Sequence, residues 1–123
     1  MLMNNMFSNT KLLEKALDAS LMRNEVIANN ISNVDTPGYK KKAVRFEELL
    51  HSAMGNGQDL NIDGIEPEVY TDNANLSYRT DGNNVDIDVQ MADMAKNTIK
   101  YNVLIARMNG KFNSIKTVLK SSY

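Results

Sequence analysis

A long stripe of apolar residues runs through the last third of the chain, with successive members alternately four and three positions apart. This spacing places them on one face of an α-helix and is typical of helices that pack side by side. The stripe, called the packing stripe below, consists of Ile87, Met91, Met94, Thr98, Tyr101, Ile105, Met108, Phe112, Ile115 and Leu119. It predicts one helix over residues 86–120, about 50 Å long at ~1.5 Å per residue.

Local signals support this helix. Acidic residues lie in its early turns and cations in its late turns, as the helix dipole favours, and Asp86 or Asp88 is predicted as the N-cap. Gly110 is a weak point, because an interior glycine costs about 1 kcal/mol relative to alanine. The stripe stays in register on both sides of Gly110, so we expect a single helix, straight or bent there.

A second helix is predicted over residues 8–34, with Ser8 or Asn9 as its N-cap. Its own stripe consists of Leu13, Leu17, Ser20, Asn24, Ile27 and Ile31. The fold class is therefore mostly α, with long N- and C-terminal helices paired as an antiparallel coiled-coil-like hairpin within one unit, 1–123. Residues 35–85 are expected to form a turn and an extended, loop-rich middle, with short β pieces at 68–71 and 76–79 that could pair as a hairpin.

Each helix also carries a second row of small or apolar residues on another face. The row consists of Leu12, Ala19 and Val26 in the first helix and of Ala92, Ala95, Ile99, Val103 and Ala106 in the last. The middle segment has few apolar residues, so we expect neighbouring subunits to cover both rows and the isolated chain to be marginally stable. Periodicity alone fits an ordinary helical hairpin or bundle equally well.

The run from 28 to 40 joins the first helix to the middle segment. Pro37 disfavours helix at Thr36, and Pro37-Gly38 suits the centre of a type II turn. The helix should therefore end near Asn33 or Val34, with Asn33 as a left-handed C-cap. The motif residues are Asn29, Asn30, Ile31, Asn33, Thr36, Pro37, Gly38, Tyr39 and Lys40.

Little in the sequence indicates chemistry, so we predict no catalytic residues, metal, cofactor or small-molecule substrate. Asp59, Asn61, Asp63 and Gly64 match half of a calcium loop, but Tyr70 stands where the bidentate Glu is required. His51 is the only histidine, is predicted to lie at the surface at the end of the short amphipathic piece 46–50, and has no cysteine to join in a metal cluster.

The basic cluster Lys40, Lys41, Lys42 and Arg45 is the best argument for nucleic acid or an acidic membrane surface. The chain nevertheless has a net charge of −1, and two glutamates follow the cluster directly. A solvated turn or an acidic neighbouring subunit is the better interpretation, so no nucleic-acid partner is expected. We expect neither a signal peptide at the N-terminus nor a direct membrane span, because no apolar run is long enough.

The motif around Thr-Pro-Gly-Tyr-Lys resembles the N-terminal signature of flagellar axial proteins, the rod, hook and hook-associated subunits. The C-terminal third resembles the ending of the proximal-rod proteins of the flagellar basal body. The matching positions are Gly82-Asn83-Asn84-Val85-Asp86-Ile87-Asp88, Met91-Ala92, Asn97, Tyr101-Asn102, Leu104 and Lys111-Phe112. The chain departs from that pattern at Gln90, where Glu is usual, and at Gly110.

This resemblance implies a non-enzymatic subunit of the proximal rod, which self-assembles and co-assembles through its terminal helices into a periplasmic tube. That tube would transmit torque and carry the export channel, and its subunits would be exported without a cleaved signal peptide. The implied partners are other rod subunits, the adapter protein at the rod base, the membrane-embedded ring and the flagellar export gate. The alternative is a soluble helical coiled-coil interaction module, such as a secretion chaperone or adaptor.

Overall fold

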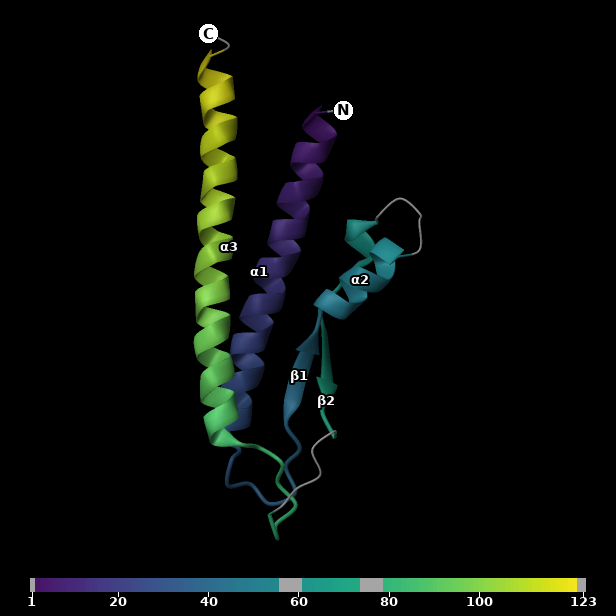
Figure 1. The fold of residues 1–123 in the computed structure, drawn as a ribbon, viewed down its shortest axis with the longest axis vertical. Helices are drawn as coiled ribbons and strands as arrows, with labels where there is room; N and C mark the ends of the chain where they lie inside the picture. The colour runs from purple at the N-terminus through teal and green to yellow at the C-terminus, as the bar shows by residue number, and fades with distance from the viewer. Residues whose placement is uncertain (1, 56–60, 74–78, 122–123) are drawn as a thin grey trace.

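Two long helices dominate the molecule, as Figure 1 shows. The computed structural model describes residues 2–55, 61–73 and 79–121. Along the chain, its elements are α1 (Leu2–Ser32), β1 (Lys42–Arg45), α2 (Glu47–Gly55), the 3-10 turn η1 (Ile62–Gly64), β2 (Glu68–Thr71) and α3 (Ile87–Ser121). The prediction of a mostly α fold with contacting N- and C-terminal helices is confirmed.

The two long helices begin and end differently from the prediction. α1 starts at Leu2, so Ser8 and Asn9 lie inside the helix and the expected N-cap there is wrong. Residues 2–7 contain no glycine or proline to stop the helix. Asp86 does cap α3, because its Oδ1 accepts hydrogen bonds from the backbone N–H groups of Asp88 (3.0 Å) and Val89 (3.4 Å). α3 then continues without interruption through Gly110.

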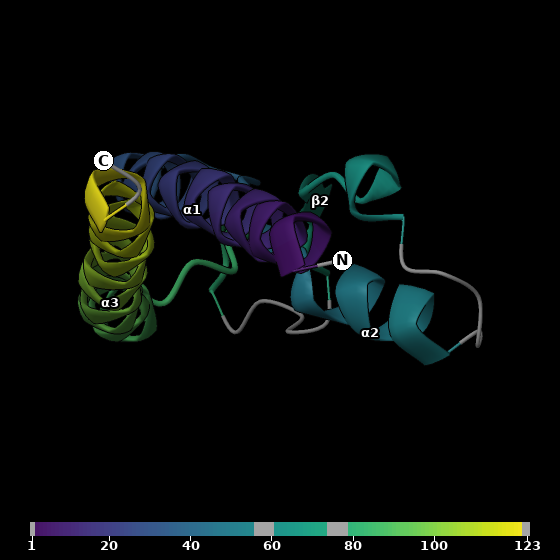
Figure 2. The same ribbon diagram turned by 90° about the horizontal axis from the view of Figure 1, so that it is seen from above.

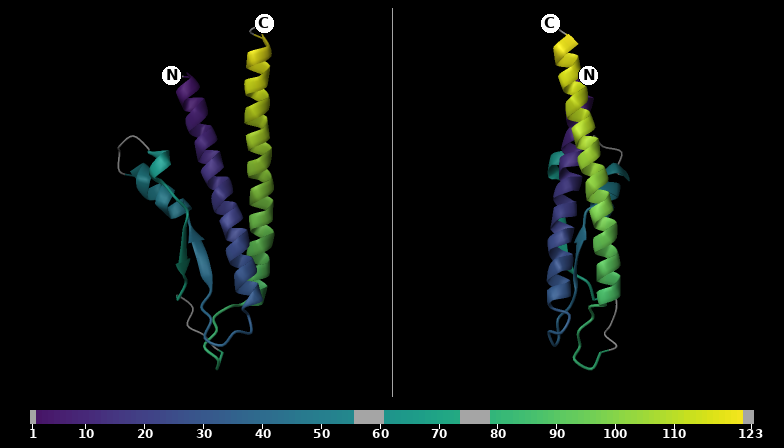
Figure 3. Two further views of the ribbon diagram at one scale, coloured as in Figure 1. Left: turned by 180° about the vertical axis from the view of Figure 1, so that it is seen from behind. Right: turned by 90° about the vertical axis from the view of Figure 1, so that its left-hand side faces the viewer.

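α1 and α3 run antiparallel and lie closest together near the loop end of the molecule, diverging toward the two termini (Figures 1 and 3). Seen from above, α1 lies between α3 on one flank and α2 with the strands on the other (Figure 2). None of the helices in the described part of the chain has the length and apolar character of a membrane-spanning segment.

The short strands β1 and β2 pair antiparallel, with Lys42 opposite Thr71 and Arg45 opposite Glu68. The β piece at 68–71 is therefore present, but β1 is its partner. The other expected piece, 76–79, lies almost entirely outside the described residues. β1 was expected to be loop because it is short and charged, and only Val44 within it is buried.

A small apolar core forms where the middle segment crosses α1. It is centred on Ala19, Phe46 and Ile65, with Leu12, Ala16, Leu49, Leu50 and Ala53 packed around them. The expectation that neighbouring subunits cover the second row of α1 is therefore wrong for Ala19 and Val26, which are both buried within the chain. The middle segment has few apolar side chains, but it concentrates them on this face of α1.

Candidate functional site: the helix junction and the outer face of α3

The Thr36–Tyr39 turn reverses the chain after α1. The Tyr39 N–H donates to the carbonyl of Thr36 (3.2 Å), and Gly38 has a φ of 73°, which together confirm the predicted type II turn. The left-handed C-cap expected at Asn33 is wrong, because no described residue other than glycine has a positive φ. Asn33 instead continues the helical hydrogen bonding, since its N–H donates to the carbonyl of Asn29 (3.1 Å).

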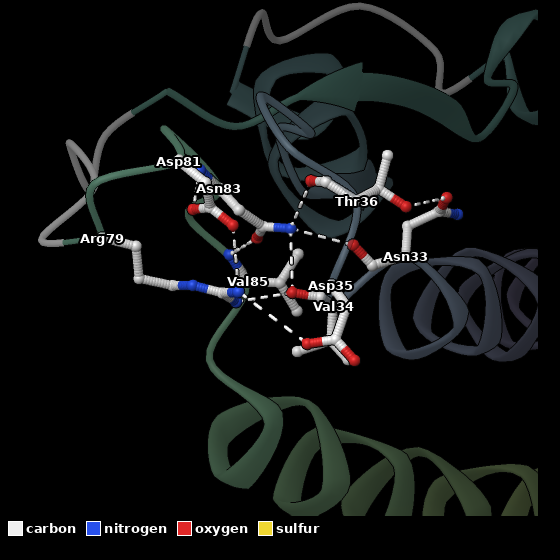
Figure 4. Close-up of polar contacts among 8 residues, drawn as sticks. All are labelled: Asn33, Val34, Asp35, Thr36, Arg79, Asp81, Asn83 and Val85. Carbon is white, nitrogen blue, oxygen red and sulfur yellow. Dashed lines mark hydrogen bonds and ion pairs between the residues drawn. The ribbon is translucent and has the colours of Figure 1, made fainter.

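Asn83, from a distant part of the sequence, contacts this turn, as Figure 4 shows. Its side chain is fully buried, and its Nδ2 donates to three backbone carbonyls at the end of α1. These carbonyls belong to Asn33 (2.8 Å), Val34 (3.0 Å) and Thr36 (2.9 Å). The Asn33 and Thr36 carbonyls also accept the backbone N–H groups of Thr36 and Tyr39, so the Asn83 amide adds hydrogen bonds from a distant segment that hold the turn after α1 in place.

The chain before α3 packs against the same turn. The Gly38 N–H donates to the carbonyl of Asp81 (2.7 Å), and the Arg79 guanidinium donates to the carbonyl of Val34 while pairing with the Asp81 carboxylate (3.1 Å). Gly82 has a φ of 79°, and a Cβ there would lie 3.7 Å from the Cα of Gly38. This distance is ordinary van der Waals contact, so the positive φ of Gly38 and Gly82, and not a lack of space, is what favours glycine at both positions.

Asn30 has the same kind of role one turn earlier in α1. It is fully buried, its Nδ2 donates to the carbonyl of Lys42 (2.8 Å) and to Oε1 of Gln90 (2.9 Å), and its Oδ1 accepts from the Lys42 N–H (2.9 Å) and the Tyr39 hydroxyl (3.1 Å). A single amide therefore connects α1 to the edge of β1 and to the first turn of α3.

A second amide network lies further along the two long helices. The Asn97 Nδ2 donates to the carbonyl of Ser20 and to Oδ1 of Asn24, both at 2.8 Å, and its Oδ1 accepts from the Ser20 hydroxyl (3.0 Å). Both Ser20 and Asn97 are buried. Buried polar groups need partners, so these bonds determine the register of α3 on α1.

The packing stripe is only partly turned toward α1. Half-buried members are Met94, Tyr101, Ile105, Met108 and Ile115, whereas Ile87, Met91, Phe112 and Leu119 are exposed. The contact side of α3 is shifted to include the buried Gln90 and Asn97 and the half-buried Leu104. On α1 the stripe residue Ile27 is buried and Leu13, Leu17 and Ile31 are half-buried.

The second row of α3 lies on its outer face. Ala92, Ala95, Ile99, Val103 and Ala106 are all exposed, with Ile99 66% and Val103 53% accessible. Soluble chains rarely leave such a continuous row uncovered without a partner. The face is a candidate surface for contact with other subunits.

Glu47, at the start of α2, connects three helices. It accepts hydrogen bonds from the Arg23 guanidinium of α1, one of them at 2.8 Å, and from the ammonium group of Lys100 of α3. The Arg23 bonds, helped by Lys100, lower the pKa of Glu47 to about 2, against the opposing effect of its partial burial. A groove of about 340 Å³ lies beside this carboxylate, between β1, α1 and α3.

Three of the four side chains of the basic cluster form contacts within the chain. Lys40 donates to the carbonyl of Gly82, Lys41 pairs with Asp72 (3.5 Å), and the Arg45 guanidinium lies 4.4 Å from the centre of the Tyr70 ring. His51 is exposed within α2, which continues past it to Gly55.

Within the residues that the structure describes, the half-matched calcium loop does not form a metal site. Asp59 lies outside the described residues, and residues 62–64 form η1. Asp63 pairs with Lys11 of α1 (3.2 Å). In the part of the chain that the structure describes, no three His, Asp or Glu side chains are grouped so as to hold a metal ion.

Comparison with known proteins matches residues 13–40 to the family described as "Flagella basal body rod protein". The chain is 42% identical to the flagellar basal body rod protein FlgB of Bacillus subtilis, over 93% of this chain and 95% of that protein. It is 35% identical to the FlgB of Borrelia hermsii (89% and 93% covered) and 31% identical to that of Escherichia coli (88% and 90% covered). These relatives are structural rod proteins and not enzymes, and they do not support the alternative of a secretion chaperone or adaptor.

Proposed function

Because the chain belongs to the FlgB family of flagellar basal body rod proteins, in which it is a structural component, we propose that it builds the proximal part of the rod by self-assembly and co-assembly through α1 and α3. The resulting tube would transmit torque and enclose the export channel. The observation that carries the proposal is the exposed second row of α3, since this apolar face has no cover within the described chain.

In this proposal, the two faces of α3 bind different partners. The side with Gln90 and Asn97 binds α1 of the same chain, and its buried amides allow one register only. The side with Ile99 and Val103 would pack against neighbouring subunits, where small residues such as Ala95 and Ala106 let helix backbones approach closely. The exposed packing-stripe residues Met91 and Phe112 would add a second apolar strip to the same assembly.

Ile99→Lys tests this surface. Ile99 is exposed in the chain, so the lysine should leave the fold of the subunit unchanged while placing a charge in the subunit contact. We expect flagellar assembly and swimming to be lost in cells that carry only this variant. The matched control is Asn109→Lys, a position that is also exposed but lies outside the row, and this variant should swim normally.

Wild-type swimming in both variants would contradict the proposal. Circular dichroism of the two purified variants should give the same helix content, so that misfolding of Ile99→Lys is separated from loss of assembly.

The proposed partners are other rod subunits, the adapter protein at the rod base, the membrane-embedded ring and the export gate. Export without a cleaved signal peptide and a periplasmic location follow from the same proposal. Purification of intact basal bodies tests it directly: the chain should be recovered in them with the N-terminus that its gene encodes. Recovery in the soluble fraction alone would contradict the assignment.

A further inference from the structure

One face of α1 carries negative charge and is left exposed by the described part of the chain. This acidic stripe consists of Glu14, Asp18, Leu21 and Glu25, spaced four, three and four residues apart. All four are exposed, and Leu21 is 51% accessible. Within the described residues, none of the three carboxylates forms an ion pair.

The later part of α3 carries only positive charge. From residue 94 to the end of the chain there are six cations and no acidic residue: Lys96, Lys100, Arg107, Lys111, Lys116 and Lys120. Lys100 pairs with Glu47, but Arg107 and Lys111 form no ion pair with any described residue. One molecule therefore carries an acidic surface on α1 and a basic surface on α3. These two surfaces do not contact each other within the described chain.

Arg107 and Lys111 line a groove between α1 and α3. The two helices diverge toward their free ends (Figures 1 and 3). The groove has a volume of about 610 Å³ and is lined by Asn9, Leu12, Leu13, Arg107, Gly110, Lys111 and Ser114. Apart from the adjacent residues and the nearby backbone of α3 itself, no described atom comes within 4 Å of the position that a Cβ on Gly110 would occupy, so packing among the described residues does not require a glycine there. A groove with apolar leucines, a glycine and two free cations suits a helix with an acidic and partly apolar face.

We propose that this groove receives the acidic stripe of α1 from a second copy of the chain. The inference rests on the proposed rod function and specifies which faces meet. Copies related by a helical screw point the same way along the tube, so α1 of one copy runs antiparallel to α3 of its neighbour, as it does within one chain. Read backwards along α1, the acidic residues Glu25, Asp18 and Glu14 are separated by seven and then four positions. Read forwards along α3, Lys100, Arg107 and Lys111 are separated by the same numbers of positions.

This alignment pairs Asp18 with Arg107 and Glu14 with Lys111. Leu21 of the neighbour then lies opposite Leu104, just before the groove, and Gly110 within the groove allows the neighbour's helix to approach closely. Electrostatic complementarity of this kind selects the partner and its register more than it adds affinity. A second copy supplies the acidic stripe, whereas an unrelated partner would require a charge pattern that nothing in this chain specifies.

Charge reversal tests the contact. We expect Asp18→Arg and Arg107→Asp each to cause loss of swimming, and the double variant to recover it, because the reversed pair attracts again. Lys116→Glu reverses a charge on the same exposed helix outside the groove, and it should swim normally. A double variant that swims no better than the worse single variant would overturn the pairing, as would wild-type swimming in both single variants.

Cross-linking gives an independent test, since the chain has no cysteine. Cells should carry two copies of the gene, one with Asp18→Cys and one with Arg107→Cys, and their basal bodies should be treated with a short bismaleimide. We expect a covalent dimer, and no dimer when Lys116→Cys replaces Arg107→Cys. Chains present in basal bodies but not cross-linked would overturn this inference alone, whereas chains absent from basal bodies would overturn the proposed function.

Discussion

At the scale of single residues, the side-chain amides of the asparagines at the junction form hydrogen bonds with backbone N–H and carbonyl groups of distant segments. Asn83 adds a donor to three backbone carbonyls in the turn that follows α1, and Asn30 supplies both a donor and an acceptor to Lys42 at the edge of β1. A buried carbonyl left without a donor costs on the order of 1–3 kcal/mol. The amides therefore matter because they connect the turn after α1 and a strand edge to distant segments by hydrogen bonds, which apolar residues of the same size cannot do.

Gly38→Ala should destabilise the folded chain by roughly 1–2 kcal/mol, the cost of a left-handed conformation for a residue with a Cβ. The space around Gly38 is open, so the loss reflects backbone strain and not a clash. Gly55→Ala is the control, because that site is equally open but has no positive φ. Urea unfolding of both variants measures the difference, and equal stabilities would show that the turn tolerates other conformations.

At the scale of elements, amides rather than apolar side chains decide how α3 lies on α1. The packing stripe predicts a contact centred on residues such as Met91 and Phe112, yet both are exposed. Gln90 and Asn97 occupy the contact because Asn30, Ser20 and Asn24 on α1 satisfy their hydrogen bonds. Apolar periodicity identifies a helix well. It does not tell which side of the helix packs within the chain, because the widest apolar side can bind another partner.

The three-helix contact of Glu47 should make stability depend on pH. Its folded pKa of about 2 lies below the ordinary value of 4.5, so the ionised carboxylate stabilises the folded state. This contribution is fully present above the ordinary pKa and is lost as the pH falls from about 5 to 2. Unfolding measured across that range should show a smaller loss of stability for Glu47→Gln than for the wild type.

Glu48→Gln is the control for that experiment, since the adjacent carboxylate has only a 3.7 Å ion pair with Arg45 on the surface. It should retain the pH dependence of the wild type. The role given to Glu47 would be contradicted if both variants followed the wild-type curve.

At the scale of the whole molecule, the chain is stabilised unevenly. α1 is covered on one flank by α3 and on the other by the middle segment, whereas the main cover of α3 among the described residues comes from α1 and the Glu47 contact. The buried residues of α3 are Gln90 and Asn97, both in its first half. The later half of α3 extends beside the diverging α1 (Figure 3), and its apolar residues Phe112, Val118 and Leu119 are exposed.

Hydrogen exchange should reveal this asymmetry. In the dilute chain, we expect the amides of residues 107–121 to exchange faster than those of residues 90–101, because the later turns open without breaking buried contacts. In assembled rods, exchange over residues 107–121 should become slow, since binding stabilises the bound conformation. Equal protection of the two halves in the dilute chain would argue against a role for assembly in ordering α3.

Several structural features were predictable because they depend on neighbouring residues. The helices follow from local periodicity, the Asp86 cap from a side chain beside its own helix, and the type II turn from Pro37-Gly38. The failures at Ser8, Asn9 and Asn33 are also local, since the helix continued past residues that often cap one. β1 gave too weak a signal, because four residues with one buried side chain show no clear alternation.

The sequence by itself determined that the chain forms two long helices with a sharp turn directly after the first, and it identified the family, since both depend on residues close together in the chain. Only the tertiary structure decided which helix faces are used and what covers them. It placed Phe46 and Ile65 over the second row of α1, and it left the corresponding row of α3 exposed. These outcomes depend on hydrogen bonds and contacts between distant segments, such as Asn97 with Ser20 and Asn83 with Thr36, which no local pattern encodes.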